Sequence, residues 1–235
     1  MKSNKKAGSL TKKDIFIIAL MCCTAVLITA TAIHNKQNFL QILPLYVSLI
    51  IGMLQSRVSR FASMLGSVNS LLYGAVYIHF NLYGSALSAI FFSCPIQALT
   101  FIRWNKHKSG HSTVLRRMTT RQRLLLLPVF AVVLAAMWFV LPLLGSEYVF
   151  LDSVTTLLGI VIYFFTMFAF VEYTALMLVN GAIGIALYLQ VLGSNPEIAT
   201  HLIFSVYSFI CVIFAFFEAK RLYKTQQQAE KELKK

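Results

Sequence analysis

Eight stretches of this chain are apolar, nearly free of charge and long enough to cross a lipid bilayer. A bilayer core of about 30 Å requires about 20 helical residues. The shortest stretch, 39–55, just reaches across if its ends extend into the interface. The stretches lie at 14–33, 39–55, 61–79, 84–102, 124–144, 151–168, 173–191 and 200–218. A chain that is 58% hydrophobic leaves nearly no room for a soluble domain. We therefore predict an all-α integral membrane protein with about eight transmembrane helices.

The basic residues predict how these spans are oriented. All but one of the 21 lysines and arginines fall in four segments that alternate spans place on the same face, and the exception is Lys36. The four segments are 2–13, 57–60, 103–123 and 220–235. The positive-inside rule makes this face cytoplasmic. We expect a multi-pass protein of the plasma membrane with both termini in the cytoplasm. The formal net charge of +13 then reflects the lipid bilayer as partner, and not nucleic acid.

The hairpin between the sixth and seventh spans lacks a basic loop. From Ser153 to Val191 the only charged residue is Glu172. One helix over this length would reach about 58 Å, far beyond the bilayer core. The chain must therefore turn near 168–172.

A polar pattern recurs in the third and seventh spans. Asn69 with Tyr77 eight residues later matches Asn180 with Tyr188, an offset of 111 residues. The flanking pairs Leu65/Leu176, Val68/Val179 and Ala75/Ala186 are also identical. An asparagine inside a membrane helix is expensive and tends to be functional. One in each of two repeated halves predicts a site at the repeat interface.

The repeat and the span count divide the chain into five segments. Segment 1–38 holds a cytoplasmic N-terminus and an accessory span, for which we expect packing or homo-oligomer formation. Two parallel three-helix repeats follow at 39–104 and 150–221, separated by a basic loop and linker helix at 105–149. A basic cytoplasmic tail ends the chain at 222–235. We expect the loop 105–123 and this tail to be mobile.

Several short motifs, in this order and spacing, resemble one known family. In the first half they are Val68–Gly74, Asn81-Leu82-Tyr83, Phe91-Phe92, Pro95-Ile96-Gln97 and Trp104. In the second half they are Asp152-Ser153, Phe170-Val171-Glu172, Asn180 and Tyr188. Together they resemble the PnuC family of nicotinamide riboside transporters, over roughly 60–105 and 150–221. The resemblance implies a fold of three, one and three helices, like that of the SWEET sugar transporters.

The resemblance also implies a function. Members take up a vitamin or nucleoside without ATP, and a separate cytoplasmic kinase traps it. The expected cargo is nicotinamide riboside. Members that carry it usually have two tryptophans before the asparagine of the seventh span, where this chain has Tyr173 and Leu176, or Thr174 and Met177 in the other register. Thiamine, riboflavin or deoxynucleosides therefore remain alternative cargoes. A substrate-capture subunit that needs an energising partner is the second hypothesis.

Amides and aromatic rings are the side chains that a riboside requires, for its hydroxyls and its flat base. Asn69 and Asn180 are the first candidates, with helix-to-helix hydrogen bonding as the alternative role. Gln97 follows Pro95, whose disruption of the backbone can aim an amide into a cavity. The other expected substrate-binding residues are Tyr73, Tyr173, Tyr207 and Thr156.

Some polar residues have other predicted roles. Tyr163 is expected to act as a gate. Glu172, at the inner hairpin, is expected to act as a gate or helix cap. Asp152 is expected to cap its own helix at the start of the sixth span. Tyr77 and Tyr188 lie near the external end, where tyrosines commonly form an interfacial belt.

The chain lacks the patterns of an enzyme. No histidine pairs with a cysteine or an acid at metal-ligand spacing, and no Walker-type glycine loop is present. We expect no catalytic residue, metal or cofactor, and so no enzyme.

Overall fold

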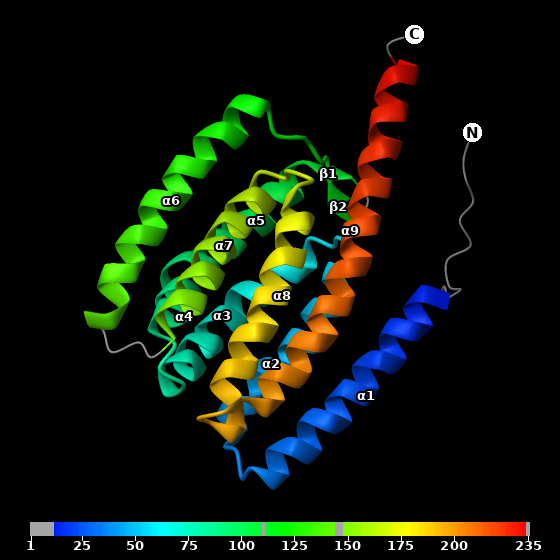
Figure 1. Cartoon of the computed structure of the whole chain (residues 1–235). Coiled ribbons are helices and arrows are strands. Elements are labelled where there is room, and N and C mark those ends of the chain that lie inside the picture. Colours follow the sequence, from blue (N-terminus) through cyan, green and yellow to red (C-terminus); the bar gives the residue numbers. More distant parts are fainter. Residues whose placement is uncertain (1–11, 110, 144–147, 234–235) are drawn as a thin grey trace.

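The computed structural model describes residues 12–109, 111–143 and 148–233, which form a bundle of membrane-length helices (Figure 1). The helices are α1 (Lys12–His34), α2 (Phe39–Gln55), α3 (Phe61–His79), α4 (Tyr83–Leu87), α5 (Cys94–Lys106), α6 (Thr120–Leu143), α7 (Val149–Met167), α8 (Tyr173–Leu192) and α9 (Ala199–Leu233). A π-helix (Ser88–Ser93) joins α4 to α5, and a 3-10 turn (Pro196–Ile198) precedes α9. Strands β1 (Lys108–Ser109) and β2 (Ser112–Thr113) form a small hairpin.

All eight predicted spans are helical, so the predicted fold class is confirmed. Seven are long and apolar enough to cross a membrane, with α4, the π-helix and α5 counting as one, and α2 is the shorter eighth. The predicted turn is confirmed too, because α7 ends at Met167 and α8 begins at Tyr173. The π-helix lies just before Pro95, which has no N–H to donate to the preceding turn.

Six helices pack as a closed ring in the order α2, α3, α5, α7, α8 and α9, and α9 returns to α2. Apart from the short α4, the two remaining helices, α1 and α6, lie on opposite sides of the bundle (Figure 1). Helix α1 packs against α9 and α2, and α6 packs against α7 and α4. Each therefore covers one of the two junctions between the predicted repeats. The packing role expected for α1 fits this position, with Ile17 and Ile28 buried.

An unusual backbone conformation recurs at the same offset of 111 residues as the polar sequence pattern. Val58, between α2 and α3, has a φ of 53°, and Ala169, between α7 and α8, has a φ of 57°. Side chains other than glycine rarely adopt this left-handed conformation. These two unusual residues are 111 positions apart, as are Asn69 and Asn180. The division into repeats 39–104 and 150–221 stays a prediction, which this correspondence supports.

The loop and the tail that we expected to be mobile have defined contacts with each other. Helix α9 continues to Leu233, well past the predicted end of the span. Gln226 on this extension donates to the carbonyl of Thr113 at 3.0 Å and accepts from the backbone N–H of Leu115 at 2.9 Å. Among the basic residues of the predicted cytoplasmic face, Lys2, Lys5, Lys6, Lys234 and Lys235 lie outside the described residues.

Asp152 does not cap its own helix, so that prediction is wrong. Its buried carboxylate instead accepts from the backbone N–H groups of Gly84 at 3.0 Å and Ser85 at 3.2 Å, and from the Ser85 hydroxyl at 2.5 Å. These N–H groups belong to the first turn of α4, where no preceding helical carbonyl is available to accept their hydrogen bonds. The carboxylate therefore joins the start of α7 to the start of α4.

Replacing Asp152 with alanine should destabilise the fold. Two N–H groups, one buried and one partly buried, would lose their acceptor, at a cost of about 2–4 kcal/mol. Asp14→Ala is the control. Asp14 forms an ion pair with Arg57, whose side chain is exposed, and ion pairs at the surface contribute less than about 1 kcal/mol. Thermal unfolding in detergent measures both. Equal shifts of the two unfolding midpoints would contradict the capping role.

Candidate functional site

The centre of the helix ring encloses a cavity of about 360 Å³. All six ring helices contribute to its walls, and its volume is within the usual range for a small-molecule site. Among the described residues, none that lines it is an aspartate, glutamate, lysine, arginine or histidine. Its polar groups are amides, hydroxyls and phenols. The cavity is therefore polar but uncharged.

Asn69 on α3 is buried and held in one orientation. Its side-chain N–H₂ donates to the Ser48 hydroxyl at 2.7 Å and to the carbonyl of Pro44 at 3.1 Å, both on α2. Ser48 in turn donates to the hydroxyl of Tyr73 at 3.1 Å. The Asn69 side-chain oxygen is buried without a hydrogen-bond partner among the described residues. Since Asn69 lines the cavity, this oxygen can accept from a ligand.

Asn180 occupies the matching position on α8, which stands opposite α3 in the ring. It also lines the cavity, and its side-chain oxygen too is buried without a partner among the described residues. Leaving a buried carbonyl unpaired costs about 1–3 kcal/mol. Two such oxygens on one cavity indicate a ligand that brings its own N–H or O–H donors.

Gln97 on α5 also lines the cavity. Its N–H₂ donates to the hydroxyls of Ser70 at 2.9 Å and Ser93 at 2.6 Å. Ser93 ends the π-helix, so the backbone disruption before Pro95 does position this amide. The Gln97 oxygen lies against Gly66 of α3, where a β-carbon would overlap it. Glycine at this position leaves room for the amide.

The structure brings most of the predicted site residues together. Tyr73, Tyr173, Thr156 and Tyr163 all line the cavity. Tyr207 does not line it. This tyrosine is buried between α9 and α2, and its hydroxyl donates to the carbonyl of Leu49 at 2.8 Å. Its contacts are those of a residue that packs the two helices together.

Tyr77 and Tyr188 close one end of the cavity, so the expected role in an interfacial belt is wrong. Both line the cavity, and their hydroxyls lie 3.4 Å apart across the ring. Tyr73 stacks on Tyr77 with 5.4 Å between ring centroids. The ring of His201 lies near both Tyr73 and Tyr188, at 6.0 and 6.1 Å. Two residues from equivalent repeat positions thus meet at this end, which we call the aromatic end.

The opposite end carries the basic loop, and we call it the basic end. Trp104 of α5 lines the cavity there and contacts Tyr173 of α8 edge to face, with 6.5 Å between ring centroids. The indole N–H of Trp104 donates to the carbonyl of Thr166 at 2.8 Å. Val58 and Ala219 complete a buried apolar cluster around these rings. This cluster separates the cavity from the basic loop.

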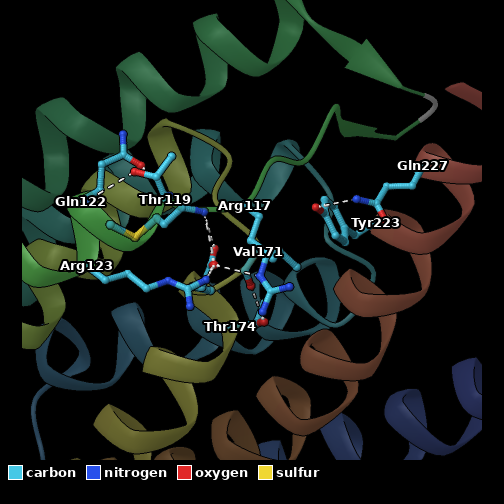
Figure 2. A network of polar contacts seen from close by, with 10 residues as sticks. Arg117, Thr119, Gln122, Arg123, Val171, Thr174, Tyr223 and Gln227 are labelled. Atoms are coloured by element: carbon cyan, nitrogen blue, oxygen red, sulfur yellow. Dashed lines mark hydrogen bonds and ion pairs between the residues drawn. The ribbon is translucent and has the colours of Figure 1, made fainter. Parts of the chain in front are cut away.

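Glu172 lies outside the cavity and holds the basic loop in place. Its carboxylate accepts from Arg123 at 2.5 Å and lies 3.8 Å from Arg117 (Figure 2). The backbone N–H of Met118 reaches the same carboxylate at 3.3 Å. The side chain makes no capping bond to α8, so a helix cap is not its role. Its predicted role as a gate is untested.

Sequence reasoning missed the serines of this site. Those that line the cavity are Ser48, Ser59, Ser63, Ser70, Ser85, Ser88, Ser205 and Ser208. Serine is common in membrane helices, where it bonds its own backbone, so a single serine carries little signal. The available signal was position. Ser70 lies next to Asn69 and four residues before Gly74, on a helix that faces the cavity along much of its length.

Membrane-spanning helices that enclose a polar, uncharged cavity between two similar halves define the class of membrane transporters. The family described as "Nicotinamide mononucleotide transporter" matches residues 38–220, and the chain belongs to this family. The predicted resemblance to the PnuC transporters and the prediction of a transporter instead of an enzyme are confirmed.

The fold is also similar to a solved structure. "Crystal structure of the Vitamin B3 transporter PnuC" aligns with a TM-score of 0.79 and 21% sequence identity. The alignment covers 93% of this chain and 95% of that chain. No curated protein matches the sequence.

Gly66→Ala should displace Gln97 and destabilise the protein by about 1–3 kcal/mol, because the new methyl group overlaps the amide. Gly159→Ala is the matched control. Gly159 lines the same cavity on α7, and nothing lies within 4 Å of the position of its added β-carbon. The control should gain about 0.5–1 kcal/mol from better helix propensity. Thermal unfolding in detergent compares them, and equal midpoints would disprove the tight contact at Gly66.

Proposed function

We propose that this protein takes up nicotinamide riboside, or a closely related riboside or vitamin, by facilitated diffusion. The observation that carries this proposal is the pair of unpartnered amide oxygens, on Asn69 and Asn180, in an uncharged cavity. They are acceptors on opposite sides of the ring, and the Asn69 amide is held in place by its bonds to Ser48 and Pro44. A ligand with donors on two sides, such as ribose hydroxyls and a carboxamide N–H₂, matches them.

The aromatic residues of the cavity suit a flat base. Tyr73, Tyr163 and Tyr173 offer ring faces or edges at different depths, and Thr156 offers a hydroxyl. A cationic ring, such as the pyridinium of nicotinamide riboside, gains about 0.5–2 kcal/mol from an aromatic face. This gain needs no carboxylate in the cavity, in agreement with the uncharged lining.

The uncharged lining also favours a riboside over its phosphorylated form. A phosphate dianion moved from water into a cavity without a cation loses its hydration with little in return. Facilitated diffusion by itself only equalises the concentration on the two sides. Phosphorylation by a separate cytoplasmic kinase would trap the riboside, because the product would no longer fit the cavity electrostatically.

Contacts between the two halves lie at both ends of the cavity, where alternating access requires gates that open in turn. At the aromatic end the contact is Tyr77 with Tyr188, and at the basic end it is Trp104 with Tyr173. Rocking of one half against the other would open one contact while the other holds. Tyr163 in the cavity wall and Glu172 beneath the basic end are the proposed gate residues.

The charge distribution supports a plasma-membrane protein with the basic end in the cytoplasm. A cargo of thiamine, riboflavin or deoxynucleosides is the alternative, since the tryptophan pair is absent. Of the four positions considered for that pair, Tyr173 and Met177 line the cavity, and Leu176 and Thr174 do not. Tight binding without flux would instead favour a capture subunit with an energising partner.

Uptake into liposomes tests the proposal. We expect purified protein to transport labelled nicotinamide riboside saturably without ATP or an ion gradient, and not to transport nicotinamide mononucleotide. Asn180→Ala should lower uptake at limiting substrate by about tenfold, because one hydrogen bond to the ligand is lost. Asn105→Ala, an exposed position outside the cavity, should match the wild type.

The same assay contains the outcomes that would overturn the proposal. Thiamine, riboflavin and a deoxynucleoside are tested in parallel, and flux of one of them alone would change the cargo. Binding of every ligand without flux would reject a stand-alone transporter. Equal uptake by Asn180→Ala and Asn105→Ala would reject Asn180 as a binding residue.

A further inference from the structure

A second cavity, of about 320 Å³, lies at the basic end and has not been given a role. Its walls come from the end of α5, the strand β2 and the turn between α7 and α8. Three of its residues, Arg103, His107 and Arg116, have basic side chains. Like the central cavity, it has no acidic residue among the described ones, but its basic side chains set it apart. Its chemistry is that of an anion site.

The arginines of this second cavity are not neutralised by the protein. Arg117 and Arg123 on the same loop pair with Glu172, but neither Arg103 nor Arg116 has an ion-pair partner among the described residues. The guanidinium of Arg103 lies 4.9 Å from the centre of the Phe168 ring, which supports its planar face. Unpaired guanidinium groups bind phosphate through two parallel hydrogen bonds.

The backbone around these side chains is firmly held. Arg116 donates its N–H to the carbonyl of Ala169 and accepts from the N–H of Val171, both at 2.9 Å. His107 accepts at its carbonyl from the Thr113 hydroxyl at 2.8 Å. The hairpin is thus attached to α5 on one side and to the α7–α8 turn on the other. The backbone that carries these side chains is therefore held in place before a ligand binds, which limits the entropy lost on binding.

Trp104 is the wall that the two cavities share. It belongs to the contact that closes the central cavity at the basic end. Arg116 lies on the loop after β2, and its backbone is bonded to the α7–α8 turn. A ligand that joins Arg103 on α5 to Arg116 would therefore also link the first predicted repeat to this turn of the second. Binding in the second cavity should therefore resist the rocking motion that opens this end.

We propose that the second cavity binds a phosphate group, and that its occupation slows transport through the central cavity. The phosphate can belong to a mononucleotide, which is the type of product that trapping by a kinase generates, or to a lipid headgroup. The binding half of the proposal is independent of the cargo, and the transport half rests on the proposed function.

Equilibrium binding of labelled AMP to the purified full-length protein in phosphatidylcholine nanodiscs tests the site. We expect inorganic phosphate to compete, and Arg116→Gln to weaken binding about tenfold. Arg116 is suited to replacement because its side chain is exposed and only its backbone holds the turn. Arg121→Gln, an exposed arginine on α6 outside the cavity, is the matched control. Absent binding, or equal binding by both variants, overturns the proposal.

Two further experiments identify the source of the phosphate and measure its effect on flux. If phosphatidylglycerol in the nanodisc displaces AMP from the wild type, the headgroup is the occupant, and a lack of displacement assigns the site to the free nucleotide. In liposomes, AMP should slow riboside uptake by the wild type and by Arg121→Gln, but not by Arg116→Gln. AMP that binds without changing flux disproves the transport half alone. A failure of all forms to transport would count against the proposed function and leave the binding result intact.

Discussion

Hydrocarbon offers no hydrogen-bond partners, and the rest of this structure depends on that constraint. Polar side chains on the spans must bond one another or face an enclosed cavity. Asn69 and Gln97 do both, since each directs its N–H₂ toward serine hydroxyls of neighbouring helices. The protein thus uses up the donors of these amides. The side-chain oxygen of Asn69, like that of Asn180, has no partner among the described residues and is the proposed acceptor for a ligand.

The predicted repeat accounts for two correspondences between the halves. Val58 and Ala169 give both halves the same turn, and Tyr77 and Tyr188 then meet because equivalent positions face each other. Helix α1 covers the α9–α2 junction as α6 covers the junction with α7. Each half can therefore be viewed as four helices, with α1 as the counterpart of α6. A central axis between similar halves allows one end to open while the other stays closed.

Most of the fold was predictable from the sequence because length and hydropathy are local properties. The spans, the turn near Glu172 and the buried asparagines follow from them. The partner of a polar side chain depends instead on which helices become neighbours. Asp152 accepts a hydrogen bond from Ser85, and Tyr207 donates one to the carbonyl of Leu49. Neither pairing can be predicted from a local sequence pattern. Ser70, which bonds Gln97, was missed for the same reason, since it became part of the polar lining only through the ring packing.

The two cavities that meet at the basic end differ in the charge of their linings. The central one has no charged lining residue among the described ones. The second one presents Arg103 and Arg116, which have no ion-pair partner in the described part of the chain. Trp104 stands between them, bonded through its indole N–H to Thr166 of the other half. A charged group added to the cargo would change which cavity it prefers, since phosphate is costly in the first and matched in the second. The charge of the phosphate would then determine both selectivity and control of the transporter. It would exclude a ligand from the central cavity and favour its binding on the other side of Trp104.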